Sequence, residues 1–388
     1  MVAVNPTLII RCPYCWRESH PGDCAIYSTI TPGKLLHPAP KPGTREYELS
    51  RTWIEDLDGP ERAMELPVRQ CPHCGELLFE GIEECETANI AVIGDTSSGK
   101  THYIAVLIDQ LKRCLTEQGN AIVEVLPLNK FTEETYRTAY YEPIIKNCEI
   151  VAPNRRGGFD AQGRPVRSKP LIFRLNIMDM SVRMNKSINI LLFDISGEEL
   201  ADGSALVQFA EHVLRADGII YLADPMSMDH IRNKVQNSIP TSSVTGRPAQ
   251  ETLSLVMKLL RSFTRVRSGE RIRVPMAIAI SKADLLRYVI DEQERTNYQF
   301  WYRPRYDGRA HLEDLMKVDR DVRTILNDYA ENSLANMTRL FDHASFFAIS
   351  ATGGPPDEYG KYDRIVPHRC LDPFIWLLWK RRFLQGER

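Results

Sequence analysis

The chain has 388 residues, of which 43% are apolar, and its formal net charge is −2. This length suits two domains, one with a substantial core, and the composition excludes a disordered or fibrous protein. The apolar run Phe374 to Trp379 is too short to span a membrane, and no signal-like stretch precedes Arg11. We therefore expect a cytoplasmic protein.

The first segment, residues 1–88, carries two CxxC pairs, Cys12 with Cys15 and Cys71 with Cys74. In a reducing compartment such pairs indicate metal binding before disulfides. Two thiolate pairs on tight turns make a tetrahedral Zn²⁺ site, similar to a zinc ribbon. The 55 residues between the two pairs exceed the usual spacing. We therefore expect an excursion of about 40 residues to loop out between the two knuckles.

The surroundings of these cysteines leave alternatives open. A redox pair and incidental buried thiols are the alternatives to zinc binding by four cysteines. Gly75 accommodates a positive φ in the second turn, whereas Trp16, at the equivalent place in the first turn, does not. Alternative ligands are His20, Cys24 and His73. Residues 1–88 hold eight Lys or Arg against fourteen Asp or Glu, the wrong sign for a phosphate backbone. We expect a structural or protein-docking module that binds no nucleic acid.

From residue 89 onward, apolar strands alternate with helical stretches, which predicts a second domain at 89–388 with insertions near 127–170 and 226–250. One helix is expected from Lys100 to about Glu117, and the last at 372–383. Strands are expected at 89–95, 171–178, 188–195, 218–224, 275–281 and 345–350. The second and third strands form a hairpin. This order predicts an α/β fold with a doubly wound, mostly parallel sheet and one antiparallel edge pair.

The turn after the first of these strands reads GDTSSGKT and matches G-x-x-x-x-G-K-[ST] between a strand and a helix. Glycines let the backbone wrap around a phosphate, and a helix N-terminus presents unpaired N–H groups. Lys100 brings a charge to the β/γ oxygens, and Thr101 offers a hydroxyl to Mg²⁺. The residues expected to hold the nucleotide are Gly94, Asp95, Thr96, Ser97, Ser98, Gly99, Lys100 and Thr101.

A second motif, DISGE, follows the second strand of the hairpin. Asp194 is a candidate to bind Mg²⁺ through water, and the Gly197 amide is a candidate γ-phosphate contact. An ordinary turn is the alternative, and the position after the phosphate loop favours the functional role.

Two motifs end the last strands and point to the base of a nucleotide. In SKAD, Asp284 can accept both N–H groups of the guanine edge while the Lys282 stem covers the base, and adenine lacks one of those donors. In ISAT, the Ala351 amide can donate to the guanine oxygen. The expected base-site residues are Ser281, Lys282, Asp284, Ser350, Ala351 and Thr352.

The order of GDTSSGKT, DISGE, SKAD and SAT resembles that of the small Ras-like GTPases of the TRAFAC class, over roughly residues 89–384. The resemblance implies a P-loop GTPase sheet, GTP and GDP as ligands, Mg²⁺ as cofactor, and hydrolysis that uses Lys100, Gly197 and Glu198. The length, an Arg-rich insertion and the front zinc module are also similar to the bacterial double-GTPase groups of multi-component GTPase systems.

The chain departs from the pattern of that class at three points. Ser281 stands where the class usually has Asn, which weakens the case for guanine, and Glu198 stands where many members have the Gln that orients the attacking water. No Thr lies just before the strand at 171–178, where the first switch is expected, and Ser168 is the nearest hydroxyl. Candidates for a catalytic arginine acting in cis are Arg155, Arg156, Arg164 and Arg167. A partner that supplies the arginine in trans is the alternative.

Three functions are compatible with these motifs. The first is a GTP-hydrolysing switch that signals to a protein effector or GTPase-activating partner. The second is a nucleotide-binding scaffold with little turnover, favoured by Glu198. The third, an ATPase acting on nucleic acid, is disfavoured by Asp284 and by the acidic front module. The helix at 372–383 is expected to pack on the sheet, and contact with a membrane surface or with a partner is its alternative role.

Overall fold

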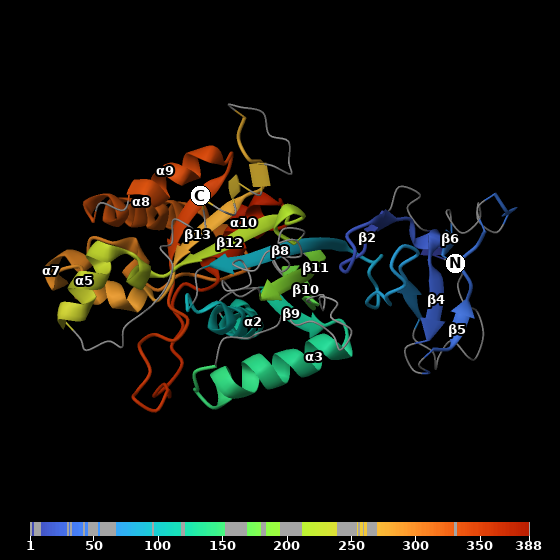
Figure 1. The fold of residues 1–388 in the computed structure, drawn as a ribbon, viewed down its shortest axis with the longest axis horizontal. Coiled ribbons are helices and arrows are strands. Elements are labelled where there is room, and N and C mark those ends of the chain that lie inside the picture. The colour runs from blue at the N-terminus through green and yellow to red at the C-terminus, as the bar shows by residue number, and fades with distance from the viewer. Residues whose placement is uncertain are drawn as a thin grey trace.

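The computed structural model describes residues 2–3, 9–28, 31, 33–41, 43–45, 53–54, 67–94, 97–117, 121–151, 169–179, 184–194, 212–238, 254, 257–258, 260–261, 270–329 and 332–387. Its centre is a seven-stranded sheet with the strand order β15-β13-β12-β8-β11-β10-β9 (Figure 1). In chain order these strands are β8 (Glu86–Gly94), β9 (Ala121–Pro127), β10 (Leu171–Asp179), β11 (Met184–Asp194), β12 (Gly218–Ala223), β13 (Met276–Ile280) and β15 (Ala344–Ala348).

Five of the seven strands are parallel, with β8 between β11 and β12. The strand β10 runs antiparallel to β11, which confirms the predicted hairpin, and the expected α/β fold class is confirmed with it. The edge strand β9, antiparallel to β10, was not expected from the sequence. It ends at Pro127, where the predicted insertion near 127–170 begins.

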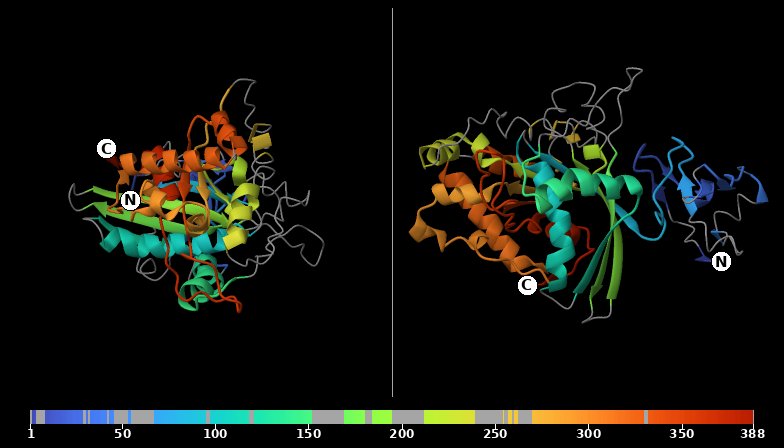
Figure 2. Two further views of the ribbon diagram at one scale, coloured as in Figure 1. Left: turned by 90° about the vertical axis from the view of Figure 1, so that its left-hand side faces the viewer. Right: turned by 90° about the horizontal axis from the view of Figure 1, so that it is seen from below.

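Helices cover both faces of the sheet (Figure 2). The helices are α2 (Lys100–Glu117), α3 (Lys130–Tyr136), η2 (Arg137–Lys146), α5 (Asp229–Ser238), α7 (Glu292–Arg295), α8 (Leu312–Asp328), α9 (Asn332–Met337) and α10 (Asp372–Lys380). The short 3₁₀ turns are η1 (Pro21–Asp23), η4 (Pro225–Ser227), η5 (Ala283–Tyr288), η6 (Gln299–Trp301) and η7 (Thr338–Leu340). The α2 helix has the bounds that the sequence predicted.

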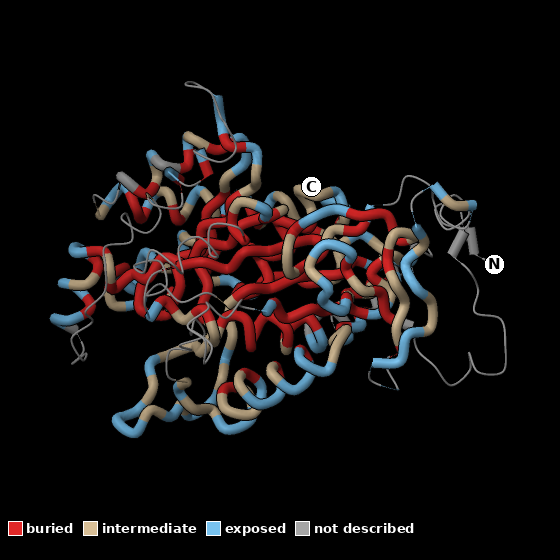
Figure 3. The backbone as a smooth tube through the Cα atoms, turned by 45° about the vertical axis from the view of Figure 1, so that its right-hand side comes forward, coloured by how far each residue is buried: buried red, intermediate tan, exposed pale blue. Residues whose placement is uncertain are grey.

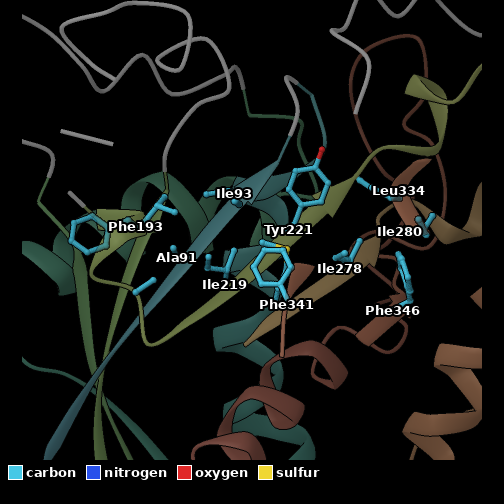
Figure 4. Close-up of a cluster of buried hydrophobic side chains, with 14 of the residues drawn as sticks. Ala91, Ile93, Phe193, Ile219, Tyr221, Ile278, Ile280, Leu334, Phe341 and Phe346 are labelled. Atoms are coloured by element: carbon cyan, nitrogen blue, oxygen red, sulfur yellow. The ribbon is translucent and has the colours of Figure 1, made fainter. Parts of the chain in front are cut away.

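Alternating side chains of the central strands divide the core into two layers. In β8, Ile90 and Val92 pack with α2, η2 and α10, whereas Ala91 and Ile93 pack with α5, α9 and most of the buried side of α8. The sheet is therefore buried on both faces (Figure 3), as parallel sheets are. Figure 4 shows the second layer, in which Tyr221 of β12 lies among side chains of β8, β13 and β15.

Short strands make up the part of the chain before the sheet. They are β1 (Val2–Ala3), β2 (Ile10–Arg11), β3 (Glu18–Ser19), β4 (Ala25–Ser28), β5 (Leu35–His37), β6 (Trp53–Ile54) and β7 (Pro67–Gln70). The three strands β5-β4-β7 form a sheet of their own, so the excursion between the two CxxC pairs has regular structure. Trp16, Phe79 and Ile82 belong to the same buried cluster as Ile172 and Phe193 of the large sheet.

The two predicted insertions contain ordered elements. The range 127–170 includes α3 and η2, and within 226–250 lie most of η4 and all of α5. A hairpin-like pairing joins the end of η2 to the segment after β15, because Ile150 N–H donates to Gly360 O over 2.9 Å and Tyr362 N–H donates to Cys148 O over 2.7 Å. The arginines at 155, 156, 164 and 167, and Ser168, lie outside the described residues.

A buried ionic network ties the C-terminal helix to the rest of the domain. The Arg369 side chain is 0% exposed and is paired with Asp372, at 2.6 Å from Nε to Oδ2, and with Asp314. Tyr306 donates its hydroxyl to Asp372 Oδ1 over 2.7 Å. Two carboxylates therefore accept from one buried guanidinium, and the phenol donates to one of these carboxylates, an arrangement in which loss of one partner is costly.

The C-terminal helix α10 packs inside the domain. Phe374, Leu377 and Leu378 are each 1% exposed or less, and Trp376 is 5% exposed. The alternative that this helix lies on a membrane surface is therefore wrong, because its apolar side chains are already covered by the sheet. Among the described residues, no helix is both long and apolar enough to cross a membrane. The last strands, β14 (Ala310–His311) and β16 (Gly386–Glu387), form a small parallel pair.

Candidate functional site

The phosphate loop connects the central strand β8 to α2. A Cβ at Gly94 would lie 2.5 Å from Leu222 O, so only glycine fits there, and Gly99 has a φ of +83°. Lys100 Nζ donates to Gly94 O over 2.9 Å, which folds the ammonium back across the loop, and Ser98 is 1% exposed. The loop therefore has the glycine pattern and lysine position of a phosphate cradle. Ser97 also has a positive φ, and Asp95 and Thr96 lie outside the described residues.

The candidate magnesium residues meet beside this loop. Thr101 donates its hydroxyl to Asp194 Oδ2 over 2.8 Å, which joins the start of α2 to the end of β11. The Tyr140 hydroxyl of η2 donates to the same oxygen over 3.1 Å. Tyr140 was not expected from the sequence, because it lies in a stretch interpreted as an insertion. A hydroxyl and a carboxylate suit Mg²⁺, which is bound through oxygen ligands and water.

Two residues of the predicted catalytic set follow Asp194 in the chain. Gly197 and Glu198 lie outside the described residues.

The expected base-reading carboxylate is held at the end of β13. Asp284 is 7% exposed, and Ser350, from the end of β15, donates its hydroxyl to Asp284 Oδ1 over 2.5 Å. Gly353 N–H donates to Ser350 Oγ over 2.9 Å, so this loop fixes the direction of the serine. Ala351 and Thr352 belong to the same loop, and the Thr352 hydroxyl donates to Gly354 O. One oxygen of the carboxylate is thus oriented by the protein.

Lys282 has a partner that the sequence did not reveal. Its ammonium lies 2.6 Å from Asp224 Oδ2, a carboxylate that is 1% exposed at the end of β12. Lys282 itself has a positive φ of 49°. Ser281, which replaces the usual Asn, donates its hydroxyl to Ala223 O over 3.2 Å. The sequence pattern that could have predicted this role of Asp224 was an Asp at the end of one strand, next to the strand that ends in SKAD.

Two rings lie near these charged groups. His102 follows Thr101 in α2, and its ring centroid is 5.7 Å from that of Tyr362 in an edge-to-face arrangement. Burial, with a smaller effect of the Lys282 charge, lowers the pKa of His102 to about 4. Burial and the nearby Asp284 carboxylate raise the pKa of Tyr362 to about 12. Both rings are therefore neutral at physiological pH.

The four expected zinc ligands come together, with all four sulfur atoms within 4.8 Å of one another. The Sγ atoms of Cys12 and Cys74 are 3.7 Å apart, as are those of Cys15 and Cys71. Tetrahedral sulfurs around zinc, at about 2.3 Å from the metal, are about 3.8 Å apart, whereas disulfide sulfurs are about 2.05 Å apart. The spacing therefore fits a metal and not a disulfide. Without a cation, burial raises the pKa of Cys74 to about 11.

The two cysteine turns share one backbone geometry. Trp16 N–H donates to Cys12 O over 2.9 Å, and Gly75 N–H donates to Cys71 O over 3.0 Å. The φ angles are 61° at Trp16 and 73° at Gly75, so the first turn adopts the glycine conformation with a tryptophan. This conformation of Trp16 was not predicted, because the left-handed region is unfavourable for a bulky residue.

The alternative ligands are engaged outside this four-sulfur group. His73 Nε2 lies 3.3 Å from Glu18 O, and His20 Nδ1 accepts from Gly22 N–H over 3.1 Å. The Cys24 thiol donates to His20 O over 3.8 Å.

A second group of possible metal ligands consists of Asp307, His311 and Glu387. Arg305 Nε lies 3.0 Å from Asp307 Oδ2, and Arg309 Nη1 lies 3.5 Å from Glu387 Oε2. Guanidinium groups therefore already balance both carboxylates, and we assign no metal to this group.

The phosphate loop leaves the central strand β8, and Asp194, Asp224 and Asp284 follow or end neighbouring parallel strands at the same edge of the sheet. Ligands bind at that edge in open α/β sheets. The chain has a P-loop GTPase fold.

Comparison with curated proteins identifies one relative of similar length. The chain is 27% identical over 333 residues to the "Putative ESX-1 scaffolding and assembly protein SaeC" of Mycolicibacterium smegmatis, and the alignment covers 81% of each chain. No protein-family model matches the chain.

Two solved structures are similar at 12% sequence identity. One is the signal recognition particle receptor SRb-GTP/SRX complex from Chaetomium thermophilum, with a TM-score of 0.30, covering 70% of this chain and 93% of the other. The second is the Arl6 BBS3 small GTPase from Trypanosoma brucei with bound nucleotide analogue GppNp, with a TM-score of 0.28, covering 76% and 98%. The fold assignment rests on the strand order and the phosphate loop.

Proposed function

We propose that the chain is a GTP-binding and GTP-hydrolysing switch that signals to a protein partner. The observation that carries this proposal is the contact between Thr101 and Asp194 beside a phosphate loop, with Asp284 at the same edge of the sheet. Such a set combines a phosphate cradle, a magnesium position and a base reader. Few other ligands than a nucleoside triphosphate would use all three.

Each side chain has a defined task in this proposal. Lys100 would exchange its bond to the Gly94 carbonyl for bonds to the β/γ oxygens, and Thr101 and Asp194 would hold Mg²⁺, Asp194 through a water. When bound, Mg²⁺ would supply positive charge that neutralises the negative charge of the phosphate oxygens. Asp284, with one oxygen bound by Ser350, accepts the two N–H groups of guanine. Glu198 orients water and Gly197 meets the γ-phosphate. The carboxylate of Glu198, in place of the usual Gln, makes intrinsic GTP hydrolysis slow, and an arginine supplied in cis or in trans raises the rate.

The four cysteines in this proposal hold one structural Zn²⁺. Its support is the match between the observed 3.7 Å sulfur spacings and the edge of a sulfur tetrahedron, about 3.8 Å. The narrower resemblance to bacterial double-GTPases remains a prediction, and the curated relative carries a different description.

A second candidate is a nucleotide-binding scaffold with little turnover. The observation that favours it is the name of the curated relative, a scaffolding and assembly protein. In that case nucleotide binding orders a surface on which other proteins assemble, and hydrolysis is incidental.

Single-turnover hydrolysis with GTP and with ATP, in the presence of Mg²⁺, distinguishes these functions. A switch hydrolyses GTP measurably and in preference to ATP, and Lys100→Ala abolishes the reaction. The exposed Lys130→Ala on α3 is the matched control and keeps the wild-type rate. Tight GTP binding without turnover would support the scaffold, and equal binding of ATP and GTP would refute guanine recognition.

A further inference from the structure

The first cysteine turn carries a residue that its backbone does not favour. Trp16 has a φ of 61°, whereas the equivalent place in the second turn is taken by Gly75. A side chain with a Cβ is unfavourable in this region, and a bulky one is an outlier. Strain of this kind persists where the surrounding structure needs the side chain. The ring of Trp16 must therefore contribute something that glycine cannot.

The Trp16 ring is 3% exposed and packs on two rings of the nucleotide domain. Its centroid is 5.7 Å from that of Phe193 and 5.4 Å from that of His212. Phe193 and His212 are stacked on each other at 3.7 Å. Phe193 directly precedes Asp194, the candidate magnesium residue, and His212 is the first described residue after 195–211. Trp16 thus contacts Phe193 and His212, the residues that flank the stretch 194–211, which begins with DISGE.

Residues of the cysteine turns also contact Lys169, which borders the second stretch that the proposed function requires to respond to nucleotide, residues 152–168. Lys169, the first described residue after 152–168, has its Nζ 3.7 Å from Glu76 Oε2. The same ammonium lies 5.7 Å from the centroid of the Tyr14 ring. Tyr14 stands between Cys12 and Cys15, and Glu76 follows the second turn. Residues of both cysteine turns therefore contact residues that flank both candidate switch stretches.

We propose that the four-cysteine module is an internal reader of the nucleotide state, coupled to the site through Trp16. This proposal rests on the proposed GTP-binding function. A change at Asp194 on nucleotide binding displaces Phe193, and the contacts among the Phe193, His212 and Trp16 rings transmit the displacement. Zinc binding fixes the turn that carries Trp16, so zinc and nucleotide each stabilise one arrangement of the same three rings.

Thermodynamic linkage gives this proposal a quantitative form. If nucleotide changes the zinc affinity by some factor, zinc changes the nucleotide affinity by the same factor. Coupling between sites in proteins is commonly about 5- to 150-fold. We expect the zinc dissociation constant to change at least about fivefold between the nucleotide-free chain and the chain saturated with Mg²⁺ and a non-hydrolysable GTP analogue.

The test measures zinc affinity in the full-length chain by equilibrium competition with a chromophoric chelator, with and without that analogue and with GDP. Nucleotide affinity is titrated in the same samples, with and without zinc. The decisive variant is Trp16→Gly, because glycine suits the φ of the turn and removes only the ring. Leu77→Ala, at a 43% exposed position in the same module, is the control. Phe193→Leu leaves the cysteine turns intact and removes a ring from the other side of the contact.

In the expected result, wild-type and Leu77→Ala chains show the same coupling factor in both titrations. Trp16→Gly still binds one zinc and the nucleotide, and its factor falls to within about twofold of unity, as does that of Phe193→Leu. If Trp16→Gly does not fold, the coupling factors of Phe193→Leu and of the wild-type chain decide the test. A wild-type factor below about fivefold with nucleotide bound overturns this proposal alone, as does unchanged coupling in both variants. A wild-type chain that binds no nucleotide overturns the proposed function as well.

Discussion

Replacing Asp284 with asparagine is expected to change which base the chain binds. Ser350 donates to Asp284 Oδ1 over 2.5 Å, so an asparagine keeps its carbonyl oxygen toward Ser350 and turns its NH₂ group toward the base. That group meets the N–H donors of guanine, and two charge-assisted hydrogen bonds are lost. At about 1.5 to 3 kcal/mol each, their loss totals about 3 to 6 kcal/mol. The GTP dissociation constant should rise by about 10² to 10⁴.

Xanthine carries a carbonyl where guanine has its amino group, so the same asparagine should bind XTP better than the wild-type carboxylate does. Competition of GTP, XTP and ATP against a fluorescent GDP analogue measures all three affinities. Asp291→Asn is the matched control, because Asp291 is exposed and its side chain caps no helix. An unchanged ratio of GTP to XTP affinity in Asp284→Asn would refute the base-reading role.

Four other outcomes are expected. In Asp194→Asn, the factor by which Mg²⁺ raises the nucleotide affinity should be about 10- to 100-fold smaller than in wild type, and Mg²⁺ titration of nucleotide binding measures this factor. Arg369→Met removes the guanidinium from the buried Asp372 carboxylate and from the partly exposed Asp314 carboxylate, and it should lower the free energy of unfolding by about 3 to 5 kcal/mol in urea titrations; a loss below about 1 kcal/mol would contradict the buried network. The pKa of His102 is about 4 in the folded chain and 6.5 for an ordinary histidine, so the unfolded chain binds more protons between these two pH values. The free energy of unfolding should therefore fall by up to about 3 kcal/mol as the pH drops through this window. The His102→Asn variant should lack this pH dependence. Elemental analysis should find one zinc per chain, lost in Cys71→Ser, and less than about half an equivalent in wild type would count against four-cysteine binding.

Some elements could be predicted because their causes are local. The α2 helix begins at Lys100 because the phosphate loop must end in a helix N-terminus, and its apolar spacing extends to Glu117. The edge strand β9 was missed although Val123 and Val125 are buried and Glu124 is exposed, which is the alternation of a half-buried strand. A seven-residue segment with this pattern acquires its partner only when β10 lies beside it.

The sequence by itself determined the phosphate loop, the cysteine pairs and the α/β order, because each depends on residues that are neighbours in the chain. Only the tertiary structure decided which distant groups meet these motifs. Tyr140 binds Asp194 across 54 positions, and Lys282 pairs with Asp224 across 58. Trp16 reaches Phe193 because both belong to one buried cluster. Burial of apolar surface is not directional, so which segments end side by side is decided only once the whole sheet is packed.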